Sequence, residues 1–247
     1  MHDMNSLTRV LIVMAMRAEA EPIISGLSLS EVDAPDSMPF RWYRGSAASL
    51  HVMVAVNGED ERFGVDSIAT IPAALNTYAA CQAFAPDLVI TAGTAGGWVR
   101  DDTEIGDVFL NSDRFVHHDR RIDLRGFDAY GIGSYPGLAV GGLAERLGCK
   151  IGTVTTSNSL DETGEDAAII RRLGGKVKEM EAAGVAYICD LLEVPIMAVK
   201  AITDLVDSPV ATSDQFFANL NIASARLGSA VVAVLLELES SALEDLA

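Results

Sequence analysis

The feature that most constrains the fold is an alternation of short apolar runs with longer segments of helical periodicity. The apolar runs are rich in β-branched residues and bounded by turn residues, which is typical of buried strands. Strands are predicted at residues 10–14, 42–44, 50–56, 87–91, 151–155, 177–180 and 195–202. A largely buried sheet covered by helices fits this pattern, so we expect an α/β protein.

Helical periodicity connects several of these strands. Helices are predicted at residues 17–26, 65–85, 182–192 and 213–238. The second tolerates Pro72 only if the helix kinks or begins there, because proline lacks the N–H that a helix interior needs. Residues 106–142 are predicted as a strand followed by a long irregular excursion, and such excursions often carry function.

Size and charge narrow the class of protein. The chain has 247 residues, of which 49% are hydrophobic, so we expect a single domain over residues 1–247 with one sizeable core. Lys and Arg number 18 against 35 Asp and Glu, a formal net charge of -17. This charge repels phosphates and anionic lipid headgroups, so neither a nucleic acid nor a membrane is an expected partner.

The expected location is cytoplasmic. Cys81, Cys149 and Cys189 are far apart and form no CxxC pair, which suits a reducing compartment better than a disulfide framework or a zinc site. The first ten residues contain no basic region followed by a long apolar stretch, and the apolar runs elsewhere are shorter than about 18 residues. We therefore expect neither an export signal nor a membrane span.

Polar side chains follow four of the predicted strands, namely Glu19, Thr94, Glu181 and Asp204. In open α/β sheets ligands bind beyond the carboxyl ends of the strands, so these four side chains are expected to face one crevice. Each also has an ordinary structural explanation. Glu19 and Glu181 suit a first helical turn, where acids complement the helix dipole, and Asp204 suits a capping turn.

The sequence TAGTAGG at residues 91–97 is predicted as a tight glycine turn that brings N–H groups close to a ligand. Glycine-rich turns between strands and helices are common, so this motif alone is weak. It lacks the GxGxxG order of dinucleotide sites and the GK[ST] ending of a P-loop.

Together, several segments resemble the nucleoside phosphorylase and nucleosidase superfamily, and within it the plant-type branch of the 5′-methylthioadenosine nucleosidases. In order, they are AMRAEAEPI, ITAGTAGGW with IGDVFL, HDRRIDLRGFDAYGIG, TSNSLD, KEMEAAGVAYICDLLEVP and VKAITDLVD. They extend from about residue 9 to residue 236, nearly the whole chain. The resemblance implies a single three-layer α/β/α domain around a mixed, twisted sheet, a homodimer, and a reaction that needs no metal or cofactor.

The resemblance also implies residue roles. Glu19 matches the catalytic base of the family, and Asp204 matches the acid that protonates adenine. The substrate-binding positions that it implies are Thr94 near the ribose and the nucleophilic water, Leu160 and Asp161 at the adenine, Met180 against the sugar, and Glu181 on the ribose hydroxyls.

These roles suit hydrolysis of the N-glycosidic bond of 5′-methylthioadenosine to adenine and the thioribose, a step of methionine salvage. The purine leaves as a poor anion unless Asp204 protonates it, and the sugar develops oxocarbenium character while Glu19 activates water. Whether S-adenosylhomocysteine is also a substrate stays open. The alternatives are a purine nucleoside phosphorylase that uses phosphate and a non-catalytic nucleoside-binding protein.

Two loops bear on these alternatives. The loop NGEDERFG places Glu59 and Asp60, with Arg62 nearby, where a phosphorylase needs an anion site, and this favours water as the nucleophile. His117 and His118 begin HHDRR, which is predicted to be a hydrogen-bonded structural segment rather than a metal site, so no metal is expected.

The pocket for the 5′-alkylthio group is expected to be apolar. Phe127 and Tyr130, in the excursion, and Phe216, on the last helix, are its candidate wall, the first two across a dimer interface; ordinary interface packing is the alternative. Many members of the family carry an aromatic residue where this chain has Ser213, which leaves that side of the pocket open.

Overall fold

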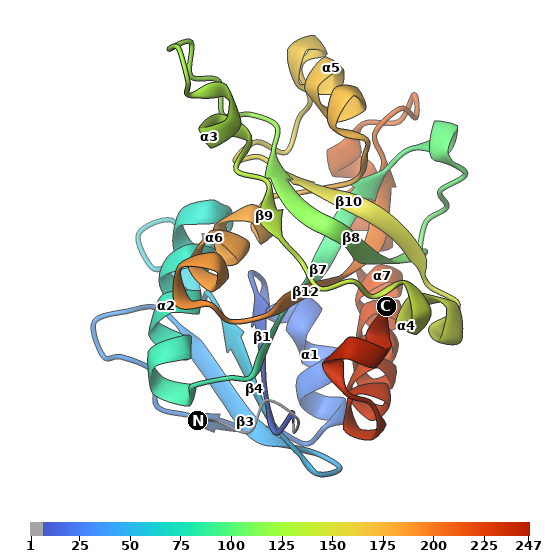
Figure 1. Ribbon diagram of the computed structural model, residues 1–247. Helices are drawn as coiled ribbons and strands as arrows, with labels where there is room; N and C mark the ends of the chain where they lie inside the picture. The colour runs from blue at the N-terminus through green and yellow to red at the C-terminus, as the bar shows by residue number, and fades with distance from the viewer. Residues whose placement is uncertain (1–6) are drawn as a thin grey trace.

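The computed structural model describes residues 7–247, which form a ten-stranded mixed sheet with helices on both faces (Figure 1). The α/β class and the three-layer arrangement around a mixed sheet are confirmed. Residues 1–6 of the predicted 1–247 domain lie outside the described residues.

The sheet has the strand order β11-β10-β8-β12-β7-β1-β4-β3-β2, with β9 paired to β8. Its strands are β1 (Arg9–Met14), β2 (Ser30–Val32), β3 (Arg41–Ala47), β4 (Leu50–Val56), β7 (Leu88–Gly97), β8 (Val108–His117), β9 (Tyr135–Pro136), β10 (Lys150–Thr156), β11 (Gly175–Glu179) and β12 (Ile196–Leu205). The central strands β4, β1, β7 and β12 are parallel. Their carboxyl ends therefore meet at one edge of the sheet.

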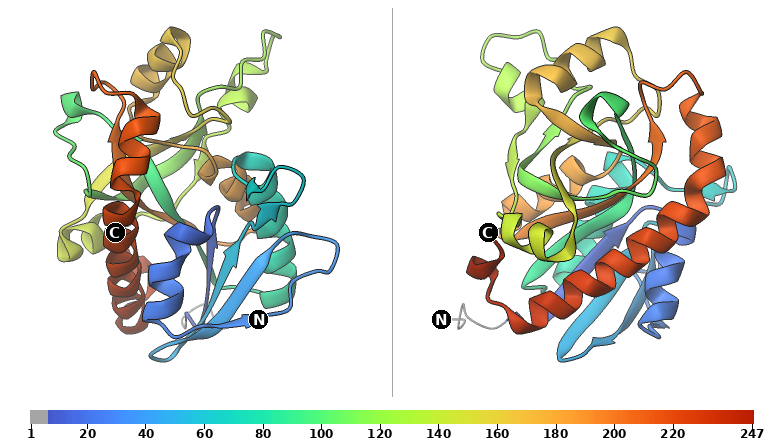
Figure 2. Two further views of the ribbon diagram at one scale, coloured as in Figure 1. Left: turned by 180° about the vertical axis from the view of Figure 1, so that it is seen from behind. Right: turned by 90° about the vertical axis from the view of Figure 1, so that its right-hand side faces the viewer.

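Helices cover the two faces of the sheet over separate apolar cores. They are α1 (Arg17–Gly26), α2 (Thr70–Phe84), α3 (Asp128–Ile132), α4 (Gly141–Leu147), α5 (Gly164–Leu173), α6 (Ala182–Leu192) and α7 (Thr212–Ser240). One core lies beneath α1, α4 and α7 and the other beneath α2 and α6, on the opposite face (Figures 1 and 2).

The long helix α7 crosses one whole face of the molecule (Figure 2). By length and composition, it is the one helix of residues 7–247 that is suited to cross a membrane. Leu227, Val231, Leu235 and Leu238 on α7 are nevertheless buried in the core beneath it, and the helix packs against α1 and β12. These contacts are those of a core helix.

Two predictions about local structure are wrong. The helix predicted at 65–85 begins at Thr70, because Val65 and Asp66 form the short strand β6 (Val65–Asp66), which pairs with β5 (Glu59–Asp60). Pro72 falls in the first turn of α2, where its missing N–H breaks no helical hydrogen bond. The TAGTAGG sequence is not a turn but the second half of β7.

The sheet also closes partly on itself. The end strand β11 meets the middle strand β7 in an antiparallel pair between Lys178 and Gly96. On the other side of β7, β12 has a register shift between Ile202 and Asp204, after which Asp204 pairs with Gly96. A bulge of this kind re-aims the side chains that follow it, so two strands bring charged residues to the same glycine.

Candidate active site

A cavity of about 460 Å³ lies at the carboxyl ends of β1, β7, β11 and β12. Seven of the residues singled out in the sequence line it: Glu19, Thr94, Leu160, Met180, Glu181, Asp204 and Phe216. Ser213 lines it as well, without an aromatic ring. The crevice expected from the ends of the strands is therefore present, and the three predicted carboxyl groups, of Glu19, Glu181 and Asp204, line it.

Glu19 lies in the first turn of α1, with its side chain in the cavity wall and only 4% exposed. Its Oε1 accepts hydrogen bonds from the Thr94 N–H at 2.8 Å and from the Thr94 hydroxyl at 2.5 Å. Burial raises the pKa of Glu19, and the Thr94 hydrogen bonds and the charge of Lys200 oppose that rise. Glu19 thus lies where it complements the helix dipole and, at the same time, in the wall of the cavity, where a carboxylate could accept a proton.

Asp204 also lines the cavity, directly after the bulge in β12. Its Oδ1 accepts a hydrogen bond from the Thr203 hydroxyl at 2.9 Å. A Cβ atom on Gly96 would lie 2.7 Å from Asp204 Oδ2, so only glycine leaves room for this carboxyl group. Burial raises the pKa of Asp204, which favours its protonated form and suits a proton donor.

Glu181 directly precedes α6 and lines the same cavity as the other two carboxyl groups. Its Oε1 accepts a hydrogen bond from the Ala69 N–H at 2.7 Å. Ala69 has φ 77° and ψ −178°, a conformation that costs a residue other than glycine about 1–3 kcal/mol. Burial, followed by the charge of Glu179, raises the pKa of Glu181.

A buried ion pair, which was not predicted from the sequence, lies next to Glu181 and the start of α6. Lys200 Nζ lies 3.0 Å from Glu179 Oε2, and both side chains are 1% exposed. Glu179 Oε2 also accepts the N–H groups of Glu181 and Ala182 at 3.0 and 2.8 Å, so it fixes the start of α6. A lysine within the apolar run PIMAVKAI was the available signal, because a buried charge requires a buried partner.

Comparison with known proteins identifies the family to which this chain belongs. The family model described as "Phosphorylase superfamily" matches residues 9–236. The chain belongs to the phosphorylase superfamily. It is 40% identical to the 5'-methylthioadenosine nucleosidase of Arabidopsis thaliana, over 97% of this chain and 91% of that protein. A second Arabidopsis thaliana relative, a 5'-methylthioadenosine/S-adenosylhomocysteine nucleosidase, is 35% identical over 97% and 95%.

Solved structures agree with this assignment to the phosphorylase superfamily. The apo structure of Arabidopsis thaliana 5'-methylthioadenosine nucleosidase has a TM-score of 0.94 to this chain, at 38% identity, and covers 97% of this chain and 99% of that one. A structure of an MTA/SAH nucleosidase has a TM-score of 0.93 at 34% identity, with the same coverage. The resemblance to the plant-type branch is thereby confirmed.

Three predicted site residues of this superfamily member do not line the cavity. Asp161 is exposed beside Leu160. Phe127, which directly precedes α3, and Tyr130, which lies within it, are 45% and 59% exposed, with ring centroids 6.0 Å apart. Their contribution to a 5′ pocket stays a prediction that requires a second copy of the chain.

In the HHDRR segment of this phosphorylase-superfamily chain, Asp119 and Arg121 are held by hydrogen bonds, whereas Nδ1 of His117 and both ring nitrogens of His118 are buried with no hydrogen-bond partner among the described residues. Asp119 Oδ2 accepts the N–H and the side-chain amide of Asn158 at 2.8 and 3.1 Å, and Arg121 pairs with Asp166. Burial lowers the pKa of His117 and His118 to about 4. Across residues 7–247, no group of three or more His, Cys, Asp or Glu side chains could hold a metal ion.

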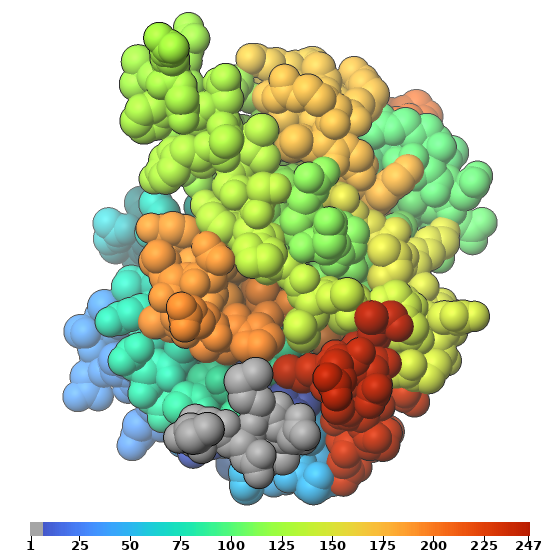
Figure 3. Space-filling view, in the orientation of Figure 1, coloured from blue at the N-terminus to red at the C-terminus, as the bar shows by residue number. Residues whose placement is uncertain are grey.

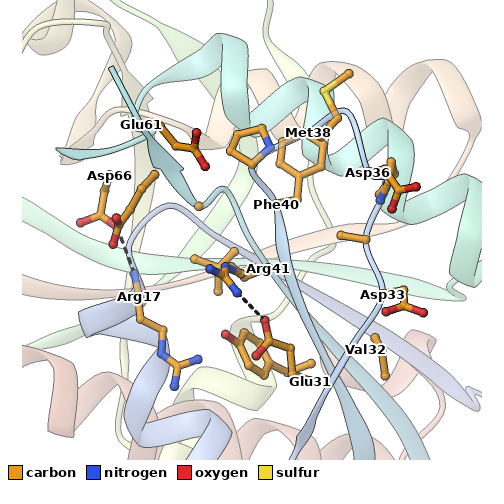
Figure 4. A pocket seen from close by; sticks show the side chains of 17 residues that line it. Arg17, Glu31, Val32, Asp33, Asp36, Met38, Phe40, Arg41, Glu61 and Asp66 are labelled. Carbon is orange, nitrogen blue, oxygen red and sulfur yellow. Dashed lines mark hydrogen bonds and ion pairs between the residues drawn. The ribbon is translucent and has the colours of Figure 1, made fainter. Parts of the chain in front are cut away.

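A second cavity of about 630 Å³ adjoins the first and shares Asp66 with it (Figure 4). Its two arginines are both engaged. Arg41 pairs with Glu31 at 2.9 Å, while Arg17 pairs with Glu21 at 2.5 Å and stacks on the Tyr43 ring. None of the residues predicted from the sequence to form the site lies in this second cavity.

Proposed function

We propose that this protein hydrolyses the N-glycosidic bond of 5′-methylthioadenosine, releasing adenine and methylthioribose. The observation that carries the proposal is one cavity in which Asp204 is placed to hold a proton and Glu19 to take one. The printed names of the Arabidopsis thaliana relatives, an MTA nucleosidase and an MTA/SAH nucleosidase, support the same reaction.

The reaction divides between the two ends of the cavity. The protonated Asp204 gives its proton to N7 of the purine, and the electron pair of the C1′–N9 bond moves to the departing adenine. Water attacks C1′ and loses a proton to Glu19. Glu181 accepts hydrogen bonds from the ribose hydroxyls and places negative charge near the oxocarbenium-like sugar. Adenine leaves neutral, and solvent returns the protons to their starting groups.

Phosphate is a poor nucleophile for this cavity. Lys178 is the one cationic side chain of residues 7–247 that lines it, and Lys178 lies at the adenine end. Arg62, the cation of the NGEDERFG loop, pairs with Asp60 at 2.6 Å and points to solvent. Asp66 adds negative charge on the Glu19 side. Phosphate, a dianion, would therefore lack cationic partners on the Glu19 side of the cavity, from which the nucleophile attacks. Water needs only Glu19 to accept its proton.

Purified protein should release adenine from 5′-methylthioadenosine at the same rate with and without phosphate. The sugar product should be free methylthioribose, identified by mass spectrometry. A sugar 1-phosphate that forms only with phosphate would replace this proposal with phosphorolysis. Tight nucleoside binding without release in either buffer would identify a binding protein.

The same assay extends to S-adenosylhomocysteine, which we propose as a second substrate on the strength of the MTA/SAH relative. The products suit a role in methionine salvage. We also propose a cytoplasmic location. The free thiols of Cys81, Cys149 and Cys189 fit a reducing compartment.

We propose that the active protein is a homodimer. An exposed apolar face, the α2–α6 face, is formed by Ile71, Leu75, Tyr78, Tyr187 and Leu191, which are 79, 44, 49, 41 and 61% exposed. The two helices lie side by side, with the excursion above them (Figure 3). A groove of about 560 Å³ runs from this face to Tyr130. Exposed apolar surface of this kind is typical of an interface, and a second copy would bring its Phe127 and Tyr130 to it.

Ile71→Lys should convert the dimer to a monomer, because a lysine at the centre of an apolar interface lacks a partner. Sedimentation equilibrium should give twice 26.2 kDa for the wild type and 26.2 kDa for the variant. Leu236→Lys is the matched control, because Leu236 is a 53% exposed aliphatic residue on α7, across the sheet. A monomeric wild type would contradict the proposal.

A further inference from the structure

Lys178 is a buried cation at the adenine end of the cavity that the mechanism above leaves without a role. Its side chain lines the cavity, and the residue is 6% exposed. Its Nζ donates a hydrogen bond to the Leu160 carbonyl at 2.6 Å, and no carboxylate of residues 7–247 forms an ion pair with it. An ammonium group has three donors, so Lys178 still has hydrogen-bonding capacity toward the cavity.

The strand pairing places Lys178 opposite the proton donor. Lys178 on β11 and Asp204 on β12 both pair with Gly96 of β7, from opposite sides. Residues in register on adjacent strands project to the same face of a sheet. Because Gly96 has no side chain, nothing from β7 stands between the ammonium group and the carboxyl group, and both line the cavity.

Resting on the hydrolytic function proposed above, we propose that Lys178 is a positioning residue for proton donation by Asp204. Its ammonium charge stabilises the carboxylate that Asp204 becomes when its proton passes to N7 of the purine. Its hydrogen bond to Leu160 holds the segment beside the base in place. The charge assists the departure of the proton, and the hydrogen bond fixes where the purine lies.

The balance of charges around the pair agrees with this role. Burial raises the pKa of Asp204, and Lys178 lowers it. The cavity thus keeps the proton on Asp204 before reaction, while Lys178 limits the cost of releasing it. The other charged or titratable groups that face Lys178 are Asp161 and Glu162 after β10, Asp166 on α5, and His118 after β8. Burial lowers the pKa of Lys178, and the charge of Asp204 together with these three carboxylates opposes that lowering and favours the ammonium form.

Three substitutions separate the charge from the hydrogen bond. Lys178→Arg keeps the charge, Lys178→Gln keeps a donor for the Leu160 carbonyl without the charge, and Lys178→Met removes both. Lys176→Met is the matched control, because Lys176 is on the same strand, pairs with Asp101 and does not line the cavity. For each protein, kcat and KM are measured from about pH 5 to pH 10 with 5′-methylthioadenosine.

In Lys178→Gln and Lys178→Met, kcat should fall about 10- to 100-fold. The alkaline limb of kcat/KM should move to higher pH by about one unit, because Asp204 loses a neighbouring positive charge. Lys178→Arg should keep the limb in place, and Lys176→Met should match the wild type. A raised KM with an unmoved alkaline limb in Lys178→Gln would overturn the charge role. A wild type that releases no adenine would instead contradict the hydrolytic function itself.

Discussion

Asp204→Asn should lower kcat for adenine release by about 10²- to 10⁴-fold, with little change in KM. Asparagine has nearly the same shape and can still accept the Thr203 hydrogen bond through its side-chain oxygen. It has no carboxyl proton for the purine, so the leaving group would depart as an anion. Steady-state kinetics with 5′-methylthioadenosine, with Asp113→Asn as a control on an exposed strand position, measures this loss. Activity within a factor of two of the wild type would exclude Asp204 as the acid.

The stability of this variant shows whether the loss is chemical or structural. Burial raises the pKa of Asp204 above its ordinary value of 3.8. As pH rises from 3.8 through the folded-state pKa, the folded protein holds a proton that the unfolded chain releases, so stability is lost across that window. Asparagine carries no charge, so Asp204→Asn should unfold at an equal or higher temperature than the wild type at pH 8. A sharply lower melting temperature would assign the loss to misfolding.

Much of the site could be predicted because the sequence places its polar residues beside strand ends. Glu19, Thr94, Glu181 and Asp204 each follow an apolar run, and parallel strands bring such positions to one edge. The bulge that aims Asp204 depends on the pairing between β12 and β7, and pairing register is not written in either strand alone. The sequence also could not show that the Asp204 carboxyl group packs against Gly96 and requires a glycine there, so this glycine was assigned to a turn.

The roles of Lys178 and Lys200 could not be predicted from the sequence, for one physical reason. Lys178, in the strand GKVKE, and Lys200, in the strand IMAVKAITDL, are both buried, and a sequence does not show which group a buried lysine will meet. Lys200 finds Glu179 on another strand, whereas Lys178 finds a carbonyl group and faces the cavity. The fold was easier to predict, because periodicity is local: α1 and α6 have their predicted bounds. Among the predicted helices, the start of α2 was misplaced, because a short hairpin precedes it.

Glu19→Gln should be about as damaging as the change at Asp204, for the opposite chemical reason. Glutamine can still accept the Thr94 N–H but cannot take a proton from water, so we expect kcat to fall by about 10²- to 10⁴-fold. Glu21→Gln is the matched control, on the same helix with an exposed side chain. Binding of adenine, measured by calorimetry, should be unchanged in Glu19→Gln, because the base end of the cavity is intact.

The pH profile assigns the two roles independently of the size of each loss. In the wild type, kcat/KM should fall at low pH as Glu19 gains a proton and at high pH as Asp204 loses one. Burial raises both pKa values, so the acid limb should lie above the ordinary range of a glutamate. The residual activity of Glu19→Gln should lack the acid limb and keep the alkaline one, and Asp204→Asn should show the reverse. If Glu19→Gln lost the alkaline limb and Asp204→Asn lost the acid limb, the acid and the base would be exchanged, because each group can remove only its own titration from the profile.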